Sequence, residues 1–425
     1  MQKIECKKIK ETAYIEKLEN GLKVIIIPKE TARRKYVIWG TNFGSIDNHF
    51  KLPGTQEEIE IPDGVAHFLE HKMFEQENGT DSLATLMALG ADANAYTTND
   101  YTAYLFECTE NFEEALTELM DYVQHPYFTD QTVAKEQGII GQEITMYDDE
   151  IGWQLYIGAM ECLYKNNPVK IDIAGSVESI ANITKETLYN CYNTFYHPSN
   201  MTFVVCGNFK PEEMLENIKS KLLPREKQEE IERIYPEEPS QINMDYKHIN
   251  MPASIPMFMI GFKDKYQEKE QVKKHIAIEI LLNILIGKSS NLYNELYEKG
   301  ILQSPPDLDY EFSKQYAHVL ISGQSKNPKE VQEALLQTIE KYKKEGLSEE
   351  EFIRIKKKIY GDYVVEFNEV GSIGRMFLAD SMKGINSFDY IEKYEEVTKE
   401  YAEEILKQVF QKEKSVLSIV EEKAE

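Results

Sequence analysis

The sequence predicts an α+β protein of two similar domains, in which each domain is a mainly antiparallel sheet with helices packed on one face. The chain has 425 residues, whereas a single hydrophobic core rarely grows beyond about 250–300 residues. Strand-like and helix-like segments follow one another without the strict alternation that marks parallel βαβ folds. A charged, proline-containing stretch at 223–245 separates two halves with a similar order of elements. We therefore expect domains at 1–222 and 246–425, joined by a linker at 223–245.

Two kinds of pattern predict the elements of the first half. Short apolar runs rich in β-branched and aromatic residues predict strands, and apolar residues with helical spacing predict helices. Asp63 and Asp130 are placed to cap helices, and Gly90 and Pro126 follow helical patterns that end before them. The expected strands cover 22–28, 36–40, 93–98, 102–108 and 201–207. The expected helices cover 65–76, 83–89, 113–124 and 130–148.

The second half repeats this rhythm. Its expected strands cover 257–262, 317–323 and 415–420, and its expected helices cover 275–286, 329–345 and 348–367. Each half ends with a buried strand followed by no further strand pattern. The shared order indicates an ancient duplication, although no sharp sequence repeat accompanies it.

The chain is strongly acidic, with a formal net charge of −25. Because such a chain repels phosphate backbones, we do not expect it to bind nucleic acid. The acidity is typical of a solvated surface. An alternative interpretation is an acidic chamber that favours basic peptides.

Cysteine usage and hydropathy restrict the class of protein further. The five cysteines are odd in number and widely spaced, and no CxxC pair occurs. This argues against a disulfide framework and against a thiolate zinc site. The first residues lack an apolar leader, and no apolar run reaches the roughly 18 residues of a membrane span. We therefore expect a cytoplasmic location and no membrane association.

His67 and His71 stand four residues apart within a predicted helix. This spacing is one helical turn, so both imidazoles project from one face about 6 Å apart. A tetrahedral zinc ion can accept one nitrogen from each ring. Glu70 directly precedes His71, and its carboxylate can reach a water molecule at such a metal. The three residues supply a Lewis acid and a general base, which peptide hydrolysis requires.

The alternative interpretation of this helix is a polar face with two incidental histidines. The composition of the helix argues against it, because two histidines and a glutamate within a largely buried element need partners. The apolar residues around them are Val65, Ala66, Phe68, Leu69, Met73 and Phe74.

A catalytic zinc ion needs a third protein ligand, which is most often a carboxylate in sites with two histidines. The predicted helix at 130–148 offers Glu136 and Glu143, seven residues apart on one stripe. Both could face the same site, and their spacing does not decide which one binds the metal. A solvated pair of glutamates is the alternative in so acidic a chain.

The pattern His-x-x-Glu-His at 67–71 resembles the inverted motif of the M16 zinc peptidases, the family of pitrilysin and of mitochondrial processing peptidase. Further stretches at 90–97, 136–144 and 196–201 are similar to segments of the same family, and the resemblance covers nearly the whole chain. The length resembles that of the bacterial two-domain subfamily. The resemblance implies that the chain forms half of a clamshell.

The family pattern also implies roles for single residues. It assigns the third zinc ligand to Glu143, and it makes Glu136 an auxiliary residue that orients a metal ligand. Asn94, Ala95 and Tyr96 resemble the family's edge strand, which binds an extended peptide as an additional strand. For Asn94, a plain turn residue is the alternative. We expect a structural role for the segment around His197 and assign that histidine no catalytic role.

One segment departs from the family pattern. Active members carry an arginine and, seven residues later, a tyrosine that hold the substrate carbonyl, whereas this chain has Tyr297 and Ser304 at those positions. An arginine would supply a charge-assisted contact to developing negative charge. In the family, a metal-free partner subunit can supply the pair. The resemblance therefore implies a homologous metal-free partner or a homodimer.

These observations predict a zinc endopeptidase with one Zn²⁺ per chain, in which His67, His71 and Glu143 bind the metal and Glu70 is the base. Its expected substrates are peptides or small unfolded segments. One alternative is a non-catalytic or weakly active scaffold subunit of a peptidase-like complex. Another is a zinc hydrolase that acts on something other than peptides.

Overall fold

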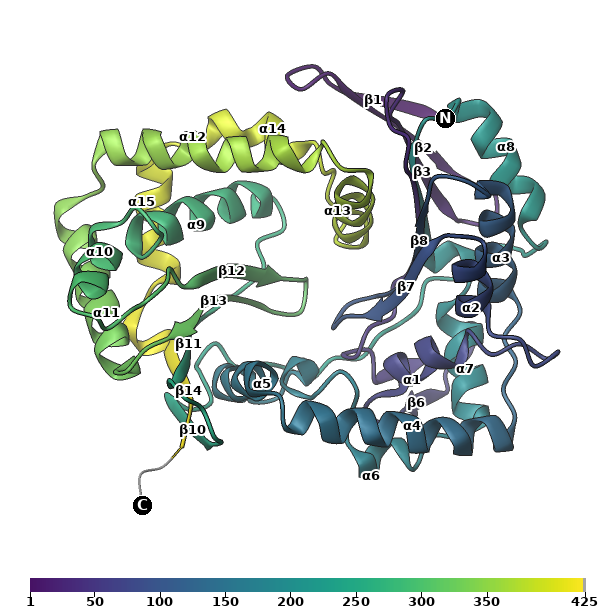
Figure 1. Cartoon of the computed structure of the whole chain (residues 1–425), viewed down its shortest axis with the longest axis horizontal. Helices are drawn as coiled ribbons and strands as arrows, with labels where there is room; N and C mark the ends of the chain where they lie inside the picture. The colour runs from purple at the N-terminus through teal and green to yellow at the C-terminus, as the bar shows by residue number, and fades with distance from the viewer. Residues whose placement is uncertain (423–425) are drawn as a thin grey trace. The chain divides into compact units, whose positions relative to one another are not determined.

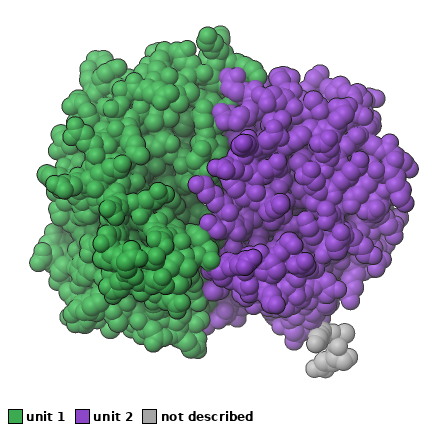
Figure 2. All heavy atoms as spheres, turned by 180° about the vertical axis from the view of Figure 1, so that it is seen from behind, with its two compact units in different colours: residues 1–144, 172–235, 364–388 green, residues 145–171, 236–363, 389–425 purple. Residues whose placement is uncertain are grey.

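A computed structural model of the chain describes residues 1–422. The chain folds into two compact units, each built from separate stretches of sequence (Figure 2). Unit 1 comprises 1–144, 172–235 and 364–388, and unit 2 comprises 145–171, 236–363 and the stretch from 389 onward. The units differ from the continuous domains expected from the sequence, because residues 145–171 pack in unit 2 and residues 364–388 pack in unit 1.

Unit 1 contains a seven-stranded sheet in the order β1-β2-β3-β9-β4-β8-β7 (Figure 1). All neighbouring strands are antiparallel except β3 and β9, which are parallel. The strands cover Gln2–Cys6 (β1), Glu11–Lys17 (β2), Lys23–Pro28 (β3), Lys35–Thr41 (β4), Asp92–Thr97 (β7), Thr102–Cys108 (β8) and Met201–Gly207 (β9). The strands predicted in this half are confirmed, and β1 and β2 are additional. His49–Lys51 (β5) and Glu58–Glu60 (β6) are also additional and form a separate two-stranded sheet.

One face of this sheet carries the main helical layer and the larger core. Val24, Val37, Trp39 and Phe203 point from the strands into this core. The helices that belong to unit 1 are Val65–Lys72 (α1), Ser82–Ala88 (α2), Phe112–Gln124 (α3), Asp130–Asp148 (α4, whose last residues fall in unit 2), Val177–Ile180 (α6), Lys185–Phe195 (α7) and Pro211–Lys221 (α8). This layer confirms the predicted α+β architecture.

The opposite face of the same sheet is covered by α13 (Val370–Met382), which packs on β4 and β9. Glycines make this approach possible. A Cβ atom on Gly40 would lie 2.8 Å from Leu378 Cδ1, and a Cβ atom on Gly374 would lie 2.3 Å from Tyr36 Cδ1. The sequence pattern did not predict that a helix from the second half would cover the first sheet.

Unit 2 contains a five-stranded sheet in the order β10-β14-β11-β13-β12. Only the pair β10 and β14 is parallel within this sheet. The strands cover Tyr246–Asn250 (β10), Met257–Asp264 (β11), Asp307–Phe312 (β12), Ala317–Gln324 (β13) and Ser415–Glu421 (β14). The helices are Ile151–Leu163 (α5), Gln271–Leu285 (α9), Asn291–Glu298 (α10), Pro328–Glu345 (α11), Glu349–Glu366 (α12), Asp389–Glu392 (α14) and Lys399–Val409 (α15).

Helices cover both faces of this second sheet as well. Ser415 on β14 accepts a hydrogen bond from Gln332 of α11, whereas a Cβ atom on Gly158 of α5 would lie 2.6 Å from Ser418 Oγ. Since side chains alternate along a strand, residues 415 and 418 face opposite sides. Each sheet is therefore backed by a helix that comes from the other half of the sequence.

The predicted linker at 223–245 is held by hydrogen bonds within each unit. In unit 1, Arg233 Nε donates to Asp47 Oδ1 at 3.0 Å, and the Tyr235 hydroxyl donates to the same oxygen at 2.6 Å. In unit 2, Glu238 accepts backbone hydrogen bonds from 165–167 and a hydrogen bond from Lys263. Within the described part of the chain, no helix is both long and apolar enough to cross a membrane.

The helix that carries the histidines differs in detail from the prediction. It ends at Lys72 instead of residue 76, because the chain then turns so that Glu75 forms a β-bridge with Asp81. The predicted cap Asp63 is wrong. Gly64 occupies the N-cap with φ 92°, a conformation that glycine adopts freely, and an added Cβ atom would lie 2.4 Å from the Ala174 carbonyl oxygen.

Candidate metal centre

His67 and His71 lie one turn apart on α1, and Glu143 reaches them from α4. The two imidazole ring centres are 4.6 Å apart. His67 Nε2 lies 3.7 Å from Glu143 Oε1, and His71 Nε2 lies 3.5 Å from Glu143 Oε2. The ligand atoms of the three residues all lie within 4.8 Å of one another.

These separations fit a tetrahedral metal ion. With metal–ligand distances near 2.0–2.1 Å, the ligands of a tetrahedral zinc ion lie about 3.4 Å apart. The two contacts to Glu143 are longer than good hydrogen bonds, so the three groups face a common point without being bonded tightly to one another. Two imidazoles and one carboxylate are also a typical donor set for zinc in hydrolases.

The two histidines differ in protonation, and the neutral ring of His67 suits metal binding. Burial and the neighbouring His71 charge lower the pKa of His67 to about 3, so its ring is neutral at ordinary pH. Burial acts to lower the pKa of His71 as well, but the Glu136 hydrogen bond and the surrounding carboxylates outweigh it and raise the pKa. A bound cation would compete with that proton, as metal ions do at histidine sites.

Glu136 lies behind His71, on the side away from Glu143. His71 Nδ1 is 3.2 Å from Glu136 Oε1, and Glu136 is buried, with 8% of its surface exposed. When Nδ1 carries the proton and donates it to Glu136, the Nε2 lone pair is free to face Glu143. The structure therefore separates the two glutamates, whose spacing in the sequence left both possibilities open.

Glu70 lies on the same helix and is buried, with 7% of its surface exposed. Burial raises the pKa of Glu70 to about 6, although the His71 charge and a hydrogen bond from Thr97 act against this. Thr97 Oγ1 donates to Glu70 Oε2 at 2.9 Å. A carboxylate with a pKa near the working pH is suited to take up and release a proton during a reaction.

The strand β7 lies at one edge of the unit 1 sheet, where its outer side has no strand neighbour within that sheet. Asn94 pairs with Leu105 of β8, so Asn94 is a strand residue and the alternative of a plain turn is wrong. Asn94 is exposed, and Ala95 and Tyr96 are half-buried. The backbone of this edge can therefore accept an extended peptide.

A cavity of about 420 Å³ joins this edge strand to the two helices. Its lining includes Asn94 and Ala95 of the edge strand. The same cavity is lined by the candidate site residues Glu70, His71 and Glu136. The rest of its lining is Phe74, Glu75, Gly79, Thr80, Asp81, Leu83, Lys135 and Ile139.

Two residues of this region were missed at the level of sequence. Thr97 directly follows Asn94, Ala95 and Tyr96. Only its hydrogen bond to Glu70 shows that it belongs to the site. Lys72 directly follows His71 and is fully buried. A lysine within an otherwise apolar helix is the signal that could have drawn attention to it.

The remaining predicted residues lie elsewhere. His197 caps a short 3₁₀ turn, where its Nδ1 atom accepts the backbone N–H of Ser199 at 3.2 Å, which agrees with a structural role. Tyr297 lies on α10 of unit 2, with 55% of its surface exposed, and Ser304 follows that helix.

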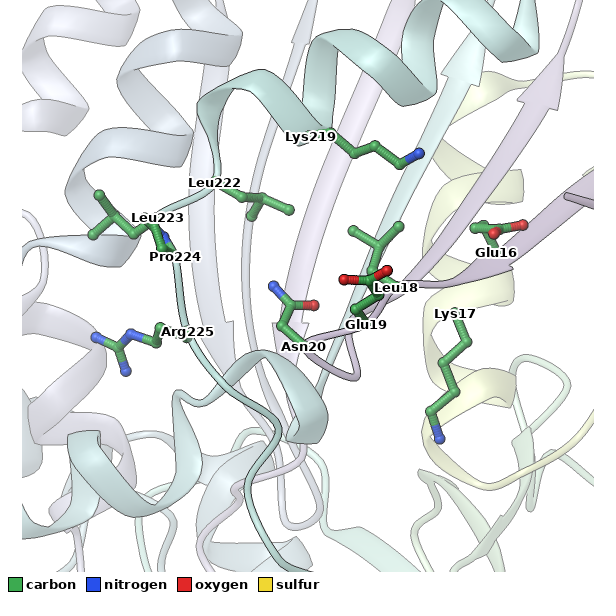
Figure 3. A pocket seen from close by; sticks show the side chains of 10 residues that line it. All are labelled: Glu16, Lys17, Leu18, Glu19, Asn20, Lys219, Leu222, Leu223, Pro224 and Arg225. Atoms are coloured by element: carbon green, nitrogen blue, oxygen red, sulfur yellow. The ribbon is translucent and has the colours of Figure 1, made fainter.

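A second cavity in unit 1, of about 450 Å³, lies between the end of β2 and the end of α8 (Figure 3). Three of its charged side chains already have partners. Glu16 binds the N-terminal amine at 2.7 Å, Lys219 binds Glu216 at 2.9 Å, and Arg225 lies over the Tyr192 ring. We assign this cavity no role in the chemistry.

Comparison with known proteins found matches to two family models and to related chains. Residues 54–176 match the family model described as Insulinase (Peptidase family M16), and residues 182–359 match the model described as Peptidase M16 inactive domain. The uncharacterized zinc protease YmfH of Bacillus subtilis is 38% identical to this chain over 410 residues, which cover 95% of each protein.

Solved structures show the same likeness. A protein described as an M16-like peptidase, from Alicyclobacillus acidocaldarius, is 32% identical, with a TM-score of 0.93 over 99% of this chain and 100% of that chain. Pitrilysin is 14% identical, with a TM-score of 0.76 over 99% of this chain and 46% of its own. At that identity the match to pitrilysin concerns the fold alone.

Proposed function

The chain belongs to the M16 peptidase family, and on this premise we propose that it is a zinc-dependent endopeptidase that hydrolyses peptides or small unfolded segments. The observation that carries the proposal is the convergence of His67, His71 and Glu143 on one point, with the Glu70 carboxylate on the same helix. The names of the relatives, which include several zinc proteases, support the choice of metal.

A zinc ion held by these three residues would polarise the scissile carbonyl and lower the pKa of an attacking water. The chain's own residues perform the remaining tasks. Glu70 takes a proton from the water and passes it to the leaving amine nitrogen. Thr97 holds one oxygen of Glu70, which leaves the other oxygen to face the water. The backbone at Asn94, Ala95 and Tyr96 pairs with the extended peptide, and the adjoining cavity accepts one of its side chains.

We further propose that the active assembly contains a second polypeptide, either a homologous metal-free partner or a second copy of this chain. Tyr297 and Ser304 stand where a substrate-holding arginine and tyrosine are expected, so this chain does not offer that pair there. Purification of the chain from its own cells tests this, because a partner of similar size should copurify with it. Full turnover by the isolated monomer would contradict the need for a partner.

The second candidate function is a non-catalytic or weakly active scaffold. It is favoured by the altered pair at Tyr297 and Ser304 and by the match to an inactive-domain model. That model covers 182–359, a range that contains none of the metal-site residues. The match therefore describes the second half of the chain and does not count against the site at His67, His71 and Glu143.

The variant Glu70→Gln tests the proposed function. Because Gln keeps the shape of Glu but cannot take up the proton, peptide hydrolysis should fall by roughly 100- to 10,000-fold. Zinc content should stay unchanged, since Glu70 is not among the three metal ligands. The assay is cleavage of a quenched fluorescent peptide, with zinc measured on the same samples. Hydrolysis at the wild-type rate by zinc-loaded Glu70→Gln would overturn the assignment of the base.

A further inference from the structure

Lys72 is a fully buried lysine next to a proposed metal ligand. It is the last residue of α1, directly after His71, and 0% of its surface is exposed. Lysine is almost never fully buried unless it is paired, because removing its charge from water is costly. The position therefore needs an explanation beyond packing.

The partners of Lys72 are two carboxylates. Its Nζ atom forms an ion pair with Glu75, three residues further along, and lies 3.7 Å from Glu136 Oε2. Glu75 is partly exposed and is also 3.8 Å from the exposed Lys135, whereas Glu136 is nearly covered by protein. Lys72 is thus a buried cation that faces Glu136, a carboxylate with little access to water.

Glu136 divides its two oxygens between different partners. Oε1 lies 3.2 Å from His71 Nδ1, and Oε2 faces Lys72. A carboxylate is planar, so the partner of one oxygen helps to determine where the other oxygen points. An ion pair at Oε2 therefore helps to keep Oε1 aimed at His71, and Nε2 of the same ring aimed at Glu143.

We propose that Lys72 is a positioning residue for the metal, which acts through Glu136 to hold His71 with Nε2 facing Glu143 and so strengthens zinc binding. The inference rests on the proposed function, because it concerns the same metal site. Partners that orient metal ligands typically contribute roughly 10- to 100-fold to metal affinity.

A direct electrostatic effect of Lys72 has the opposite sign. A positive charge close to a dication disfavours its binding, so removal of the lysine charge alone should tighten zinc binding. If Lys72 instead acts by positioning, its removal should weaken zinc binding. The direction of the change therefore separates the two explanations.

The experiment measures the dissociation constant for zinc of the metal-free full-length chain, by competition with a chromophoric chelator. Lys72→Met, which keeps the length of the side chain and removes its charge, should weaken zinc binding by roughly tenfold or more. Lys135→Met is the matched control, because Lys135 is exposed, pairs with the same Glu75, and acts on Glu136 only as a weaker charge than Lys72. Its dissociation constant should remain that of the wild type.

A double variant tests the route through Glu136. If Lys72 acts through that carboxylate, adding Lys72→Met to Glu136→Gln should cause no further loss of zinc affinity. A general loosening of α1 would weaken binding by the same factor in both backgrounds, and this result would overturn the proposal. Where Lys72→Met does not fold, Lys72→Gln takes its place, with a loss in the same direction.

The outcomes distinguish this inference from the proposed function. Unchanged or tighter zinc binding in the charge-removing variant, beside a wild type that binds zinc, overturns the role of Lys72 and leaves the peptidase proposal intact. A wild-type chain that binds no zinc overturns both.

Discussion

Thr97→Val removes the hydroxyl that donates to the proposed catalytic base, while it preserves the branched shape that suits the strand β7. Thr97 Oγ1 lies 2.9 Å from Glu70 Oε2, and Glu70 has 7% of its surface exposed, so little water can replace the lost donor. The neighbouring Thr102 hydroxyl donates to the Phe43 carbonyl at 2.9 Å and is not available as a substitute. The Glu70 carboxylate should therefore become free to rotate away from the attacking water.

The size of the effect follows from the strength of a hydrogen bond to a charged group, which is about 1.5–3 kcal/mol. At about 1.4 kcal/mol for each factor of ten, loss of this bond should lower kcat by roughly 10- to 150-fold. KM should change little, because the backbone edge proposed to bind the peptide is unaltered. The assay is steady-state cleavage of a fluorescent peptide by zinc-loaded protein.

Thr97→Ser is the control for this prediction. Serine keeps the donor and should restore most of the lost kcat. The reasoning is refuted if Thr97→Val retains kcat within about twofold of the wild type at equal zinc content, since such a change lies far below the expected energy. It is also refuted if the loss appears in KM alone.

Three further predictions concern the metal and the stability of each unit. Chelation of zinc should abolish hydrolysis and added zinc should restore it, whereas activity that persists without metal would contradict the metal site. Arg233→Met leaves the buried Asp47 carboxylate without its cation and should lower the free energy of unfolding by about 3 kcal/mol in urea titrations; a change below about 1 kcal/mol would contradict this. Burial raises the pKa of Glu279 from 4.5 to about 7, so the folded state holds an extra proton and stability should fall as pH rises through that interval. Glu279→Gln should flatten this pH dependence, and an unchanged slope would rule out Glu279 as its source.

Much of the architecture could be predicted because local patterns and tertiary structure agree. The apolar run of β4 and the amphipathic pattern of α3 each match the burial observed for Trp39 and Leu119. The exchange of α5 and α13 between the sheets could not be predicted, since an amphipathic pattern shows that a face is buried but not which sheet buries it. Asp63 was a plausible cap, but close contact with Ala174 requires the left-handed conformation of Gly64 instead.

The candidate site could likewise be predicted only in part from the sequence. The spacing of His67 and His71 is sufficient to place both rings on one side of a helix, because helix geometry alone sets it. The different positions of Glu136 and Glu143 depend on how α4 crosses α1. Their seven-residue spacing places both on one stripe of the helix but does not predict that crossing. The proposed role of Lys72 depends on its contacts with Glu75 and with Glu136, which lies on another helix. The sequence alone could not predict these contacts.

The central claim is that His67, His71 and Glu143 together hold a zinc ion. The most direct test is the zinc content per chain of protein purified without chelators, measured for the wild type and for Glu143→Ala by elemental mass spectrometry. We expect about one zinc ion per wild-type chain and a large loss in the variant. A wild type with below about a tenth of an equivalent, or a Glu143→Ala variant that retains its zinc fully, would contradict the claim.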